Sequence, residues 1–386
     1  MTIRLRLGLV TLLAATALAG CGKKEEAPPA DAAAGGAAAP AAAGAEEKVV
    51  NVYNWSDYID PAMLEKFTAE TGIKVNYDVF DSNEVLETKL LAGRSGYDVV
   101  VPTAPFLERQ IKAGVFLPFD KSKLPNLKNM DPDIMQRTAA HDPGNDHSIN
   151  YLWGTVGLGY NPDLVKKAIG TDTIDSWSAL LDPAIASRLG KCGIAILDAP
   201  TDVFGSVAIY RNLDPNSEKP EDLKVVEDTL MKIRPYIRYF HSSQYINDLA
   251  SGEICLALGW SGDVLQARDR GAAAAKPVPV KYVIPKEGAI NFFDMLAIPA
   301  DAPHPDNAHA FLNYLMEPEV IAKVTNKVRF ANANIASLPY VDDSIKNDPG
   351  IYPDAATRSR LHPDLVESQQ FSRELNRSWT RVRSGQ

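Results

Sequence analysis

Apolar residues in the first third of the chain form short runs that alternate with segments of helical periodicity. Three runs rich in Val and Tyr predict strands, namely KVVNVYN (48–54), IKVNYDV (73–79) and YDVVV (97–101). Each run is followed by a stretch in which apolar residues recur every three to four positions, as in PFLERQIKAG (105–114). Three strand-helix units in succession predict an α/β fold with a parallel sheet flanked by helices.

Capping residues mark where the first two of these helices begin and end. Asp60 can cap a helix that has Pro61 in its first turn and Gly72 just past its end. Ser82 can cap the run NEVLETKLLA, which Gly93 stops. The ligand crevice of a parallel sheet lies beyond the carboxyl ends of its strands. We therefore expect the residues that follow the first and third strands to share one rim.

The middle of the chain has a strand and helix pattern of its own. Strands are predicted at WGTVGLGYN (153–161), CGIAIL (192–197) and ICLALGW (254–260), with helical runs around 202–211, 221–233 and 243–251. INFFDMLAIPA (290–300) predicts a further strand, and helical NAHAFLNYLM (307–316) follows it. The pattern predicts a second sheet domain.

Length also favours two lobes, because roughly 340 residues exceed the size at which one core keeps growing. We expect a first lobe of 48–152 plus 280–325 and a second lobe of 153–279 plus 326–386. The chain would then cross between the lobes near 153–161 and 280–300, and two crossings make a hinge.

The N-terminus predicts export. Residues 1–20 hold two arginines and an apolar run of about a dozen residues, which is typical of a signal peptide and too short to span a bilayer. The sequence LAGC resembles the bacterial lipobox, so Cys21 is the expected lipidation site; an ordinary signal with a chance cysteine is the alternative. Residues 21–47 are mostly Ala, Gly, Pro and Glu and predict a disordered tether. We expect a periplasmic protein, lipid-anchored to a bacterial membrane.

Charge and cysteine content narrow the class further. The formal charge is −9, and loss of the two arginines in residues 1–20 makes it −9 − 2 = −11, so the chain has no basic nucleic-acid footprint. Besides Cys21, the chain holds Cys192 and Cys255, an even pair in an oxidising compartment. We predict a disulfide between them, with two separate buried thiols as the alternative.

Large rings and carboxylates occur together at the ends of predicted strands. Trp55 and Asp57 follow the first strand, and Trp260 and Asp263 repeat that combination in LGWSGDV. Asp294 lies in the middle of an apolar strand, where a carboxylate is costly to bury unless a cation or hydrogen-bond donors meet it.

Asp202 follows another predicted strand, and Phe330 adds a ring. Each such residue alone is more readily explained by a core or capping role. Together they predict a crevice lined by rings and acids. A primary ammonium is attracted to ring faces and to carboxylates, so the crevice suits a small organic cation, and two separated acids suit two ammonium groups.

Motifs of catalysis and metal binding are incomplete. GWSGD (259–263) misses the nucleophile elbow, because Asp263 replaces the second glycine of G-x-S-x-G. The glycines of 154–159 do not form a dinucleotide fingerprint, and neither H-E-x-x-H nor C-x-x-C occurs. HDPGNDH (141–147) contains Pro, Gly and Asn, so a surface turn is favoured there over a metal site. We expect no catalytic residue, cofactor or metal, and no enzyme; an extracellular hydrolase or amine-modifying enzyme is the disfavoured alternative.

From about residue 48 onwards the chain resembles the putrescine-type polyamine-binding proteins of bacterial ABC importers. The resemblance rests on NWSDYI, DSNEVLETKL, DVVVPTAPFLERQ, HSSQYINDL, GWSGDV, IPKEGA, FFDMLAIPADA and ANAN. It implies a two-lobed type II periplasmic binding fold and also the disulfide. It implies these ligand-binding residues: Trp55, Ser56, Asp57, Tyr58, Thr103, Asp202, Ser242, Trp260, Asp263, Phe292, Asp294 and Phe330.

Three positions depart from the pattern of the putrescine-binding members. Thr103 replaces an expected Ser, Asp202 an expected Glu, and Phe330 an expected Tyr, which removes a hydroxyl donor. The choice among putrescine, cadaverine, agmatine and spermidine therefore stays open.

The sequence predicts a monomeric, lipid-anchored solute-binding protein that delivers a polyamine, with putrescine as the first choice, to an ABC permease. A polyamine sensor that signals to a membrane receptor is the alternative.

Overall fold

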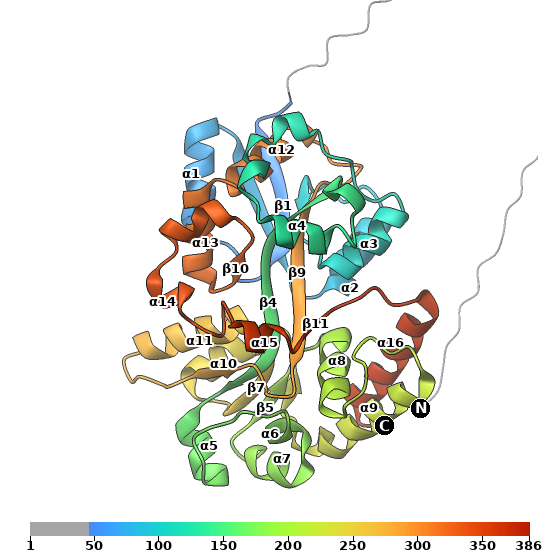
Figure 1. Ribbon diagram of the computed structural model, residues 1–386, viewed down its shortest axis with the longest axis vertical. Helices are drawn as coiled ribbons and strands as arrows, with labels where there is room; N and C mark the ends of the chain where they lie inside the picture. Colours follow the sequence, from blue (N-terminus) through green and yellow to red (C-terminus); the bar gives the residue numbers. More distant parts are fainter. Residues whose placement is uncertain (1–45) are drawn as a thin grey trace, which may run out of the picture. The chain divides into compact units, whose positions relative to one another are not determined.

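The computed structural model describes residues 46–386 (Figure 1). The predicted signal peptide, the lipidation of Cys21 and all but the last two residues of the predicted tether lie outside the described residues. Within 46–386, no helix has the length and apolar character needed to cross a bilayer.

The first part of the sheet is built from the three predicted strand-helix units. Strand β1 (Val49–Trp55) pairs in parallel with β2 (Lys74–Phe80) and with β3 (Val99–Val100), which confirms the predicted parallel sheet. Helices α1 (Pro61–Thr71), α2 (Asn83–Leu91) and α3 (Ala104–Lys112) follow the three strands.

The predicted helix caps are confirmed. The Asp60 side chain accepts a hydrogen bond from the backbone N–H of Ala62, and Gly72 ends α1 with φ of 71°. Ser82 accepts from the backbone N–H of Val85 at the start of α2. Local sequence thus sets where α1 begins and ends and where α2 begins.

Two long strands join this first part of the sheet to a second part, which holds the strands predicted at 192–197 and 254–260. The first part of β4 (Ser148–Tyr160) pairs antiparallel with β9 (Ala289–Ala297), and its last five residues pair with β7 (Leu256–Trp260). The strand order is β2-β1-β3-β9-β4-β7-β5-β6, with β5 (Ile194–Ile196) and β6 (Tyr239–Phe240) at one end. Figure 1 shows β4 and β9 side by side through the middle of the molecule. A single strand therefore belongs to both parts, and the sheet is mixed.

Helices flank the sheet. The predicted helical runs become α8 (Pro200–Tyr210), α9 (Pro220–Ile233), α10 (Gln244–Ser251) and α12 (Pro305–Leu315). The pattern did not specify the remaining ones: α4 (Pro132–Thr138), α5 (Pro162–Ile169), α6 (Ser178–Leu181), α7 (Pro183–Leu189), α11 (Ser261–Ala273), α13 (Pro318–Val328), α14 (Asp343–Lys346), α15 (Ala355–Arg358) and α16 (Gln369–Ser384).

The C-terminal segment passes between the two parts once more. Strand β10 (Ala331–Asn332) pairs with β4 at Leu152 and Trp153, and β11 (Leu361–Pro363) pairs in parallel with β9. Helix α16 then packs on α8 and α9. The segment 326–386 therefore begins beside the N-terminal part of β4 and ends on helices α8 and α9, which flank the second part of the sheet. The exact lobe boundaries stay a prediction.

The predicted disulfide between Cys192 and Cys255 is present in the structure. It links the residues just before β5 and β7, which are neighbouring parallel strands. The two cysteines are 63 positions apart, and the chain-entropy relation gives a stabilisation of about 4 kcal/mol for a loop of that length. The bond ties together the starts of β5 and β7, and β7 is the strand that ends at Trp260.

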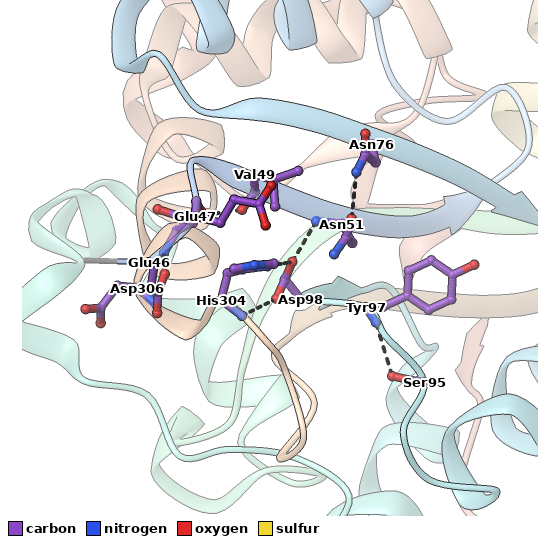
Figure 2. Close-up of polar contacts among 11 residues, drawn as sticks. Glu46, Glu47, Val49, Asn51, Asn76, Ser95, Tyr97, Asp98, His304 and Asp306 are labelled. Atoms are coloured by element: carbon purple, nitrogen blue, oxygen red, sulfur yellow. Dashed lines mark hydrogen bonds and ion pairs between the residues drawn. The ribbon is translucent and has the colours of Figure 1, made fainter. Parts of the chain in front are cut away.

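The start of β1 is fastened to the loop before α12 (Figure 2). The buried Asp98 carboxylate accepts hydrogen bonds from the backbone N–H of Asn51 at 2.7 Å and of His304 at 2.6 Å, and His304 Nδ1 lies 3.1 Å from it. Glu46 accepts from the backbone N–H of Asp306, in the first turn of α12. These contacts hold β1 at the end opposite to Trp55.

Candidate ligand-binding site

A cavity with about 590 Å³ of empty space lies at the carboxyl end of β1. Its opposite wall comes from the first turns of α8 and α11, so both parts of the sheet contribute to it. It brings together eleven of the twelve predicted ligand residues: Trp55, Ser56, Tyr58, Thr103, Asp202, Ser242, Trp260, Asp263, Phe292, Asp294 and Phe330.

Asp294 is held by two neutral donors. Its carboxylate accepts a hydrogen bond from the Tyr58 hydroxyl at 2.7 Å and from the Thr103 hydroxyl at 3.0 Å. Thr103 is in turn fixed by Asn83, which donates to its hydroxyl at 2.8 Å. The three side chains come from the turn after β1, the start of α3 and the middle of β9, so this acid is oriented by the whole rim of the first sheet.

Asp263 and Asp202 occupy the first turns of α11 and α8, where the helix dipole favours a carboxylate. Asp263 accepts from the Tyr245 hydroxyl at 2.8 Å, and Asp202 accepts from the Trp260 indole N–H at 2.9 Å. Each has one neutral donor and no cation of the protein at hydrogen-bond distance in the part of the chain that the structure describes.

Burial dominates the electrostatics of these three acids. It raises the pKa of Asp202, of Asp263 and of Asp294 to about 7 in each case, although hydrogen bonds from Trp260, from Tyr245, and from Tyr58 with Thr103 act in the opposite direction. Neither these neutral donors nor, for Asp263, the more distant charge of Arg270 offsets the effect of burial. The cavity is therefore prepared for a cation.

Aromatic rings make up the remaining walls. Trp55 and Trp260 meet edge to face with ring centroids 5.6 Å apart, and Tyr58 and Phe330 do so at 4.9 Å. Trp55 donates its indole N–H to the Val101 carbonyl, which orients its ring at the end of β1. The rings offer apolar contact to an aliphatic chain and a negative face to an ammonium group.

Two glycines make room for the Phe330 ring. A Cβ on Gly262 would lie 2.2 Å from a Phe330 ring carbon, and one on Gly154 would lie 2.9 Å from another. Gly262, the second glycine of GWSGD, thus leaves space for a ring in the cavity wall. Ser261, in the same motif, is buried, and its oxygen accepts from the backbone N–H of Thr155, as suits a structural residue.

Ser242 has a buried hydroxyl in the cavity wall. Its side chain is 4% exposed, and its oxygen has no hydrogen-bond partner within residues 46–386. A buried polar atom without a partner is costly, so this hydroxyl is suited to a polar group of a ligand.

Asp57 does not line the cavity, contrary to the prediction. It adopts a left-handed backbone conformation with φ of 55°, and its carboxylate forms an ion pair with Arg270 at 2.7 Å. The turn directs Asp57 outward, because Ser56 and Tyr58, on either side, take the positions that face the cavity.

Sequence reasoning missed six residues that line the cavity: Phe80, Asp81, Asn83, Thr201, Ser243 and Asp364. The first three follow or end β2, and the rule that ligands bind at strand carboxyl ends could have indicated them. Thr201 and Ser243 adjoin predicted residues. Asp364 follows β11, a strand that the hydrophobic pattern did not predict.

The fold and this cavity together define a periplasmic binding protein of type II, as the resemblance implied. The chain belongs to the bacterial extracellular solute-binding protein family, whose profile matches residues 62–353.

Individual relatives cover most of the chain. It is 54% identical over 344 residues to the putrescine-binding periplasmic protein SpuD of Pseudomonas aeruginosa, which spans 88% of this chain and 93% of that protein. It is 52% identical over 343 residues to the putrescine-binding periplasmic protein PotF of Escherichia coli, with the same coverage of both. The structure of the spermidine/putrescine ABC transporter substrate-binding protein of Streptococcus pneumoniae matches with a TM-score of 0.71 and 27% identity, over 88% of this chain and 99% of that one.

Proposed function

We propose that this protein binds an aliphatic polyamine, with putrescine as the preferred ligand, and delivers it to an ABC permease for uptake. One observation carries the proposal. The cavity is lined by five aspartates and six aromatic rings, and no Lys, Arg or His is among its lining residues in 46–386. Anionic oxygens and ring faces are the two features that bind a primary ammonium.

The positions of the acids fit a ligand with a cationic group at each end. Asp294 belongs to the wall formed by β9 and α3, whereas Asp202 and Asp263 belong to the wall formed by α8 and α11. The rings of Trp55, Trp260 and Phe292 line the same cavity and can cover an apolar chain. A linear diamine has this distribution of charge and apolar surface.

The names of the relatives support putrescine as the ligand and the periplasm as the location. They do not support the sensor alternative. The proposal includes the lipid anchor at Cys21, which rests on the lipobox-like sequence LAGC, and a monomeric state. The protein binds and releases its ligand without changing it chemically.

Charge removal at the two walls tests the proposal. Asp263→Asn and Asp294→Asn should each weaken putrescine binding at least tenfold in titration calorimetry, because an ammonium group of the ligand loses its charged partner. The control is Asp175→Asn, an exposed acid paired with Lys286 that does not line the cavity; it should leave the dissociation constant within about twofold. Unchanged affinity in both cavity variants, with their folded state verified by thermal melting, contradicts the proposal.

A further inference from the structure

A second cavity adjoins the ligand cavity. It has about 710 Å³ of empty space and is bounded by α8, α9, the loop between them and the segment 364–375. Asp364 and Thr201 line both cavities. These two residues therefore stand where the two cavities adjoin.

The lining of the second cavity also suits an organic cation. Apolar residues such as Phe204, Phe371 and Leu375 form part of its wall, and no Lys, Arg or His belongs to the described lining. Its carboxylates are Asp214, Glu218, Asp222, Asp364 and Glu367.

Most of these acids already have a partner in the fold. Glu218 accepts from the backbone N–H and the hydroxyl of Ser368, at the start of α16. Asp222 accepts from the Ser217 hydroxyl, and Asp214 accepts from a backbone N–H in the same loop. These contacts explain the three residues as parts of the loop and of the helix cap.

Glu367 is also paired, because its carboxylate lies 3.9 Å from the Arg109 guanidinium. Asp364 differs from the other acids. Within residues 46–386 its carboxylate has neither a hydrogen-bond donor nor an ion-pair partner, while its backbone N–H bonds to the Asn291 carbonyl and holds it directly after β11. Burial, with Asp202 and Glu367 nearby, raises the pKa of Asp364 well above its usual range.

A second polar group without a partner lies on the same surface. The Ser242 hydroxyl lines the ligand cavity together with Asp364, is more than nine-tenths buried, and has no hydrogen-bond partner in the part of the chain described. A hydroxyl oxygen can accept from an ammonium or from a secondary amine. The ligand cavity thus offers an unpaired carboxylate and an unpaired hydroxyl beyond the contacts that Asp263 and Asp294 provide.

We propose that Asp364 is a further ligand-binding residue and that it extends the site to linear triamines, whose third ammonium group lies against its carboxylate. This inference rests on the proposed polyamine-binding function. Two charged groups of a triamine occupy the positions of a diamine, and the third lies where the ligand cavity meets the second cavity. The Asp364 carboxylate, which has no partner within residues 46–386, gains one that a diamine does not supply.

The test compares two ligands on matched variants. Titration calorimetry with putrescine and with spermidine should show that Asp364→Asn weakens spermidine binding at least tenfold more than it weakens putrescine binding. The control is Asp214→Asn, which lines only the second cavity and should change the affinity for either amine less than about threefold.

The outcomes separate this inference from the proposed function. If the wild-type protein binds neither amine, the proposed function fails. If it binds putrescine but not spermidine, or if Asp364→Asn leaves spermidine binding unchanged or weakens both amines equally, the inference about Asp364 alone is overturned. Should the variant not fold, a crystal structure of the wild-type protein with spermidine decides, because a nitrogen of the ligand must lie at hydrogen-bond distance from the Asp364 carboxylate.

Discussion

Asp202, Asp263 and Asp294 give the cavity its character, because the fold buries all three without a cation. Tyrosine, threonine and tryptophan donors orient the carboxylates but carry no charge. Burial therefore raises each pKa more than the donors lower it. Neutral donors fix the direction of the acids and leave their charge to the ligand.

A pH dependence of stability follows for the ligand-free protein. The pKa of Asp294 is about 7 in the folded state against 3.8 as the ordinary value, so the folded state binds more protons between these limits and loses stability as pH rises through them. Asp294→Asn removes this contribution. The Tm of the variant minus that of the wild type should increase from about pH 5 to about pH 7. A difference that stays constant or decreases over this range, by thermal melting without ligand, contradicts the assignment.

For single residues, the sequence predicted the chemical type of the cavity's side chains better than it predicted which way each side chain points. Asp294 was identifiable because an acid inside an apolar strand needs a partner, and the structure supplies Tyr58 and Thr103. Asp57 was misplaced because its left-handed conformation, which turns its side chain outward, leaves no mark in the residue pattern. Asp364 was missed because its position depends on β11, which forms only by pairing with β9.

At the scale of elements, the turn after β1 meets α11 across the two walls. Asp57 pairs with Arg270, and the Gln266 side chain donates to the Asp57 carbonyl at 3.3 Å. The two charged side chains are 43% and 35% exposed, so water and salt screen their attraction. The contact links the walls more weakly than a buried ion pair would.

Arg270→Ala should therefore weaken putrescine binding only modestly, by no more than about fivefold, since an exposed ion pair contributes at most about 1 kcal/mol. The effect should diminish as salt rises from about 0.05 M to about 0.5 M. Arg268→Ala, on the same helix but paired with Asp348, is the matched control and should show neither effect. A tenfold loss that persists at high salt would place Asp57 in direct contact with the ligand, as the sequence first suggested.

The elements themselves were predicted where local signals are strong. The strands β1 and β2 and the capped helices α1 and α2 follow from apolar spacing and from Asp60, Gly72 and Ser82. The prediction for β4 covered only its second part, because the strand begins in the polar residues around Ser148 and Asn150. Short strands such as β10 and β11 exist through long-range pairing, which no local pattern records.

On the scale of the whole molecule, β4 is shared by both parts of the sheet, and β9 and the C-terminal segment run beside it. The ligand cavity lies between walls that belong to these two parts. We expect the walls to separate by rotation about these crossings, because a few strand residues can absorb such a change.

Small-angle X-ray scattering tests this hinge. Saturating putrescine should reduce the radius of gyration, since the ligand bridges acids on both walls. A double variant, Asp263→Asn with Asp294→Asn, should show no reduction at the same putrescine concentration. An identical radius of gyration with and without saturating putrescine in the wild-type protein, where calorimetry verifies binding, rules out closure.

The lack of a positive side chain among the lining residues of the cavity has a practical consequence. A protein whose buried acids find their countercharge only in the cargo is expected to hold that cargo through purification, because without a cation the acids, with pKa values of about 7, must take up protons or bear the full cost of burial. Dialysis of the native protein will remove the amine slowly, and a titration on such a preparation will report competition between added and retained amine. Unfolding in denaturant, washing and refolding before each measurement yields the empty form.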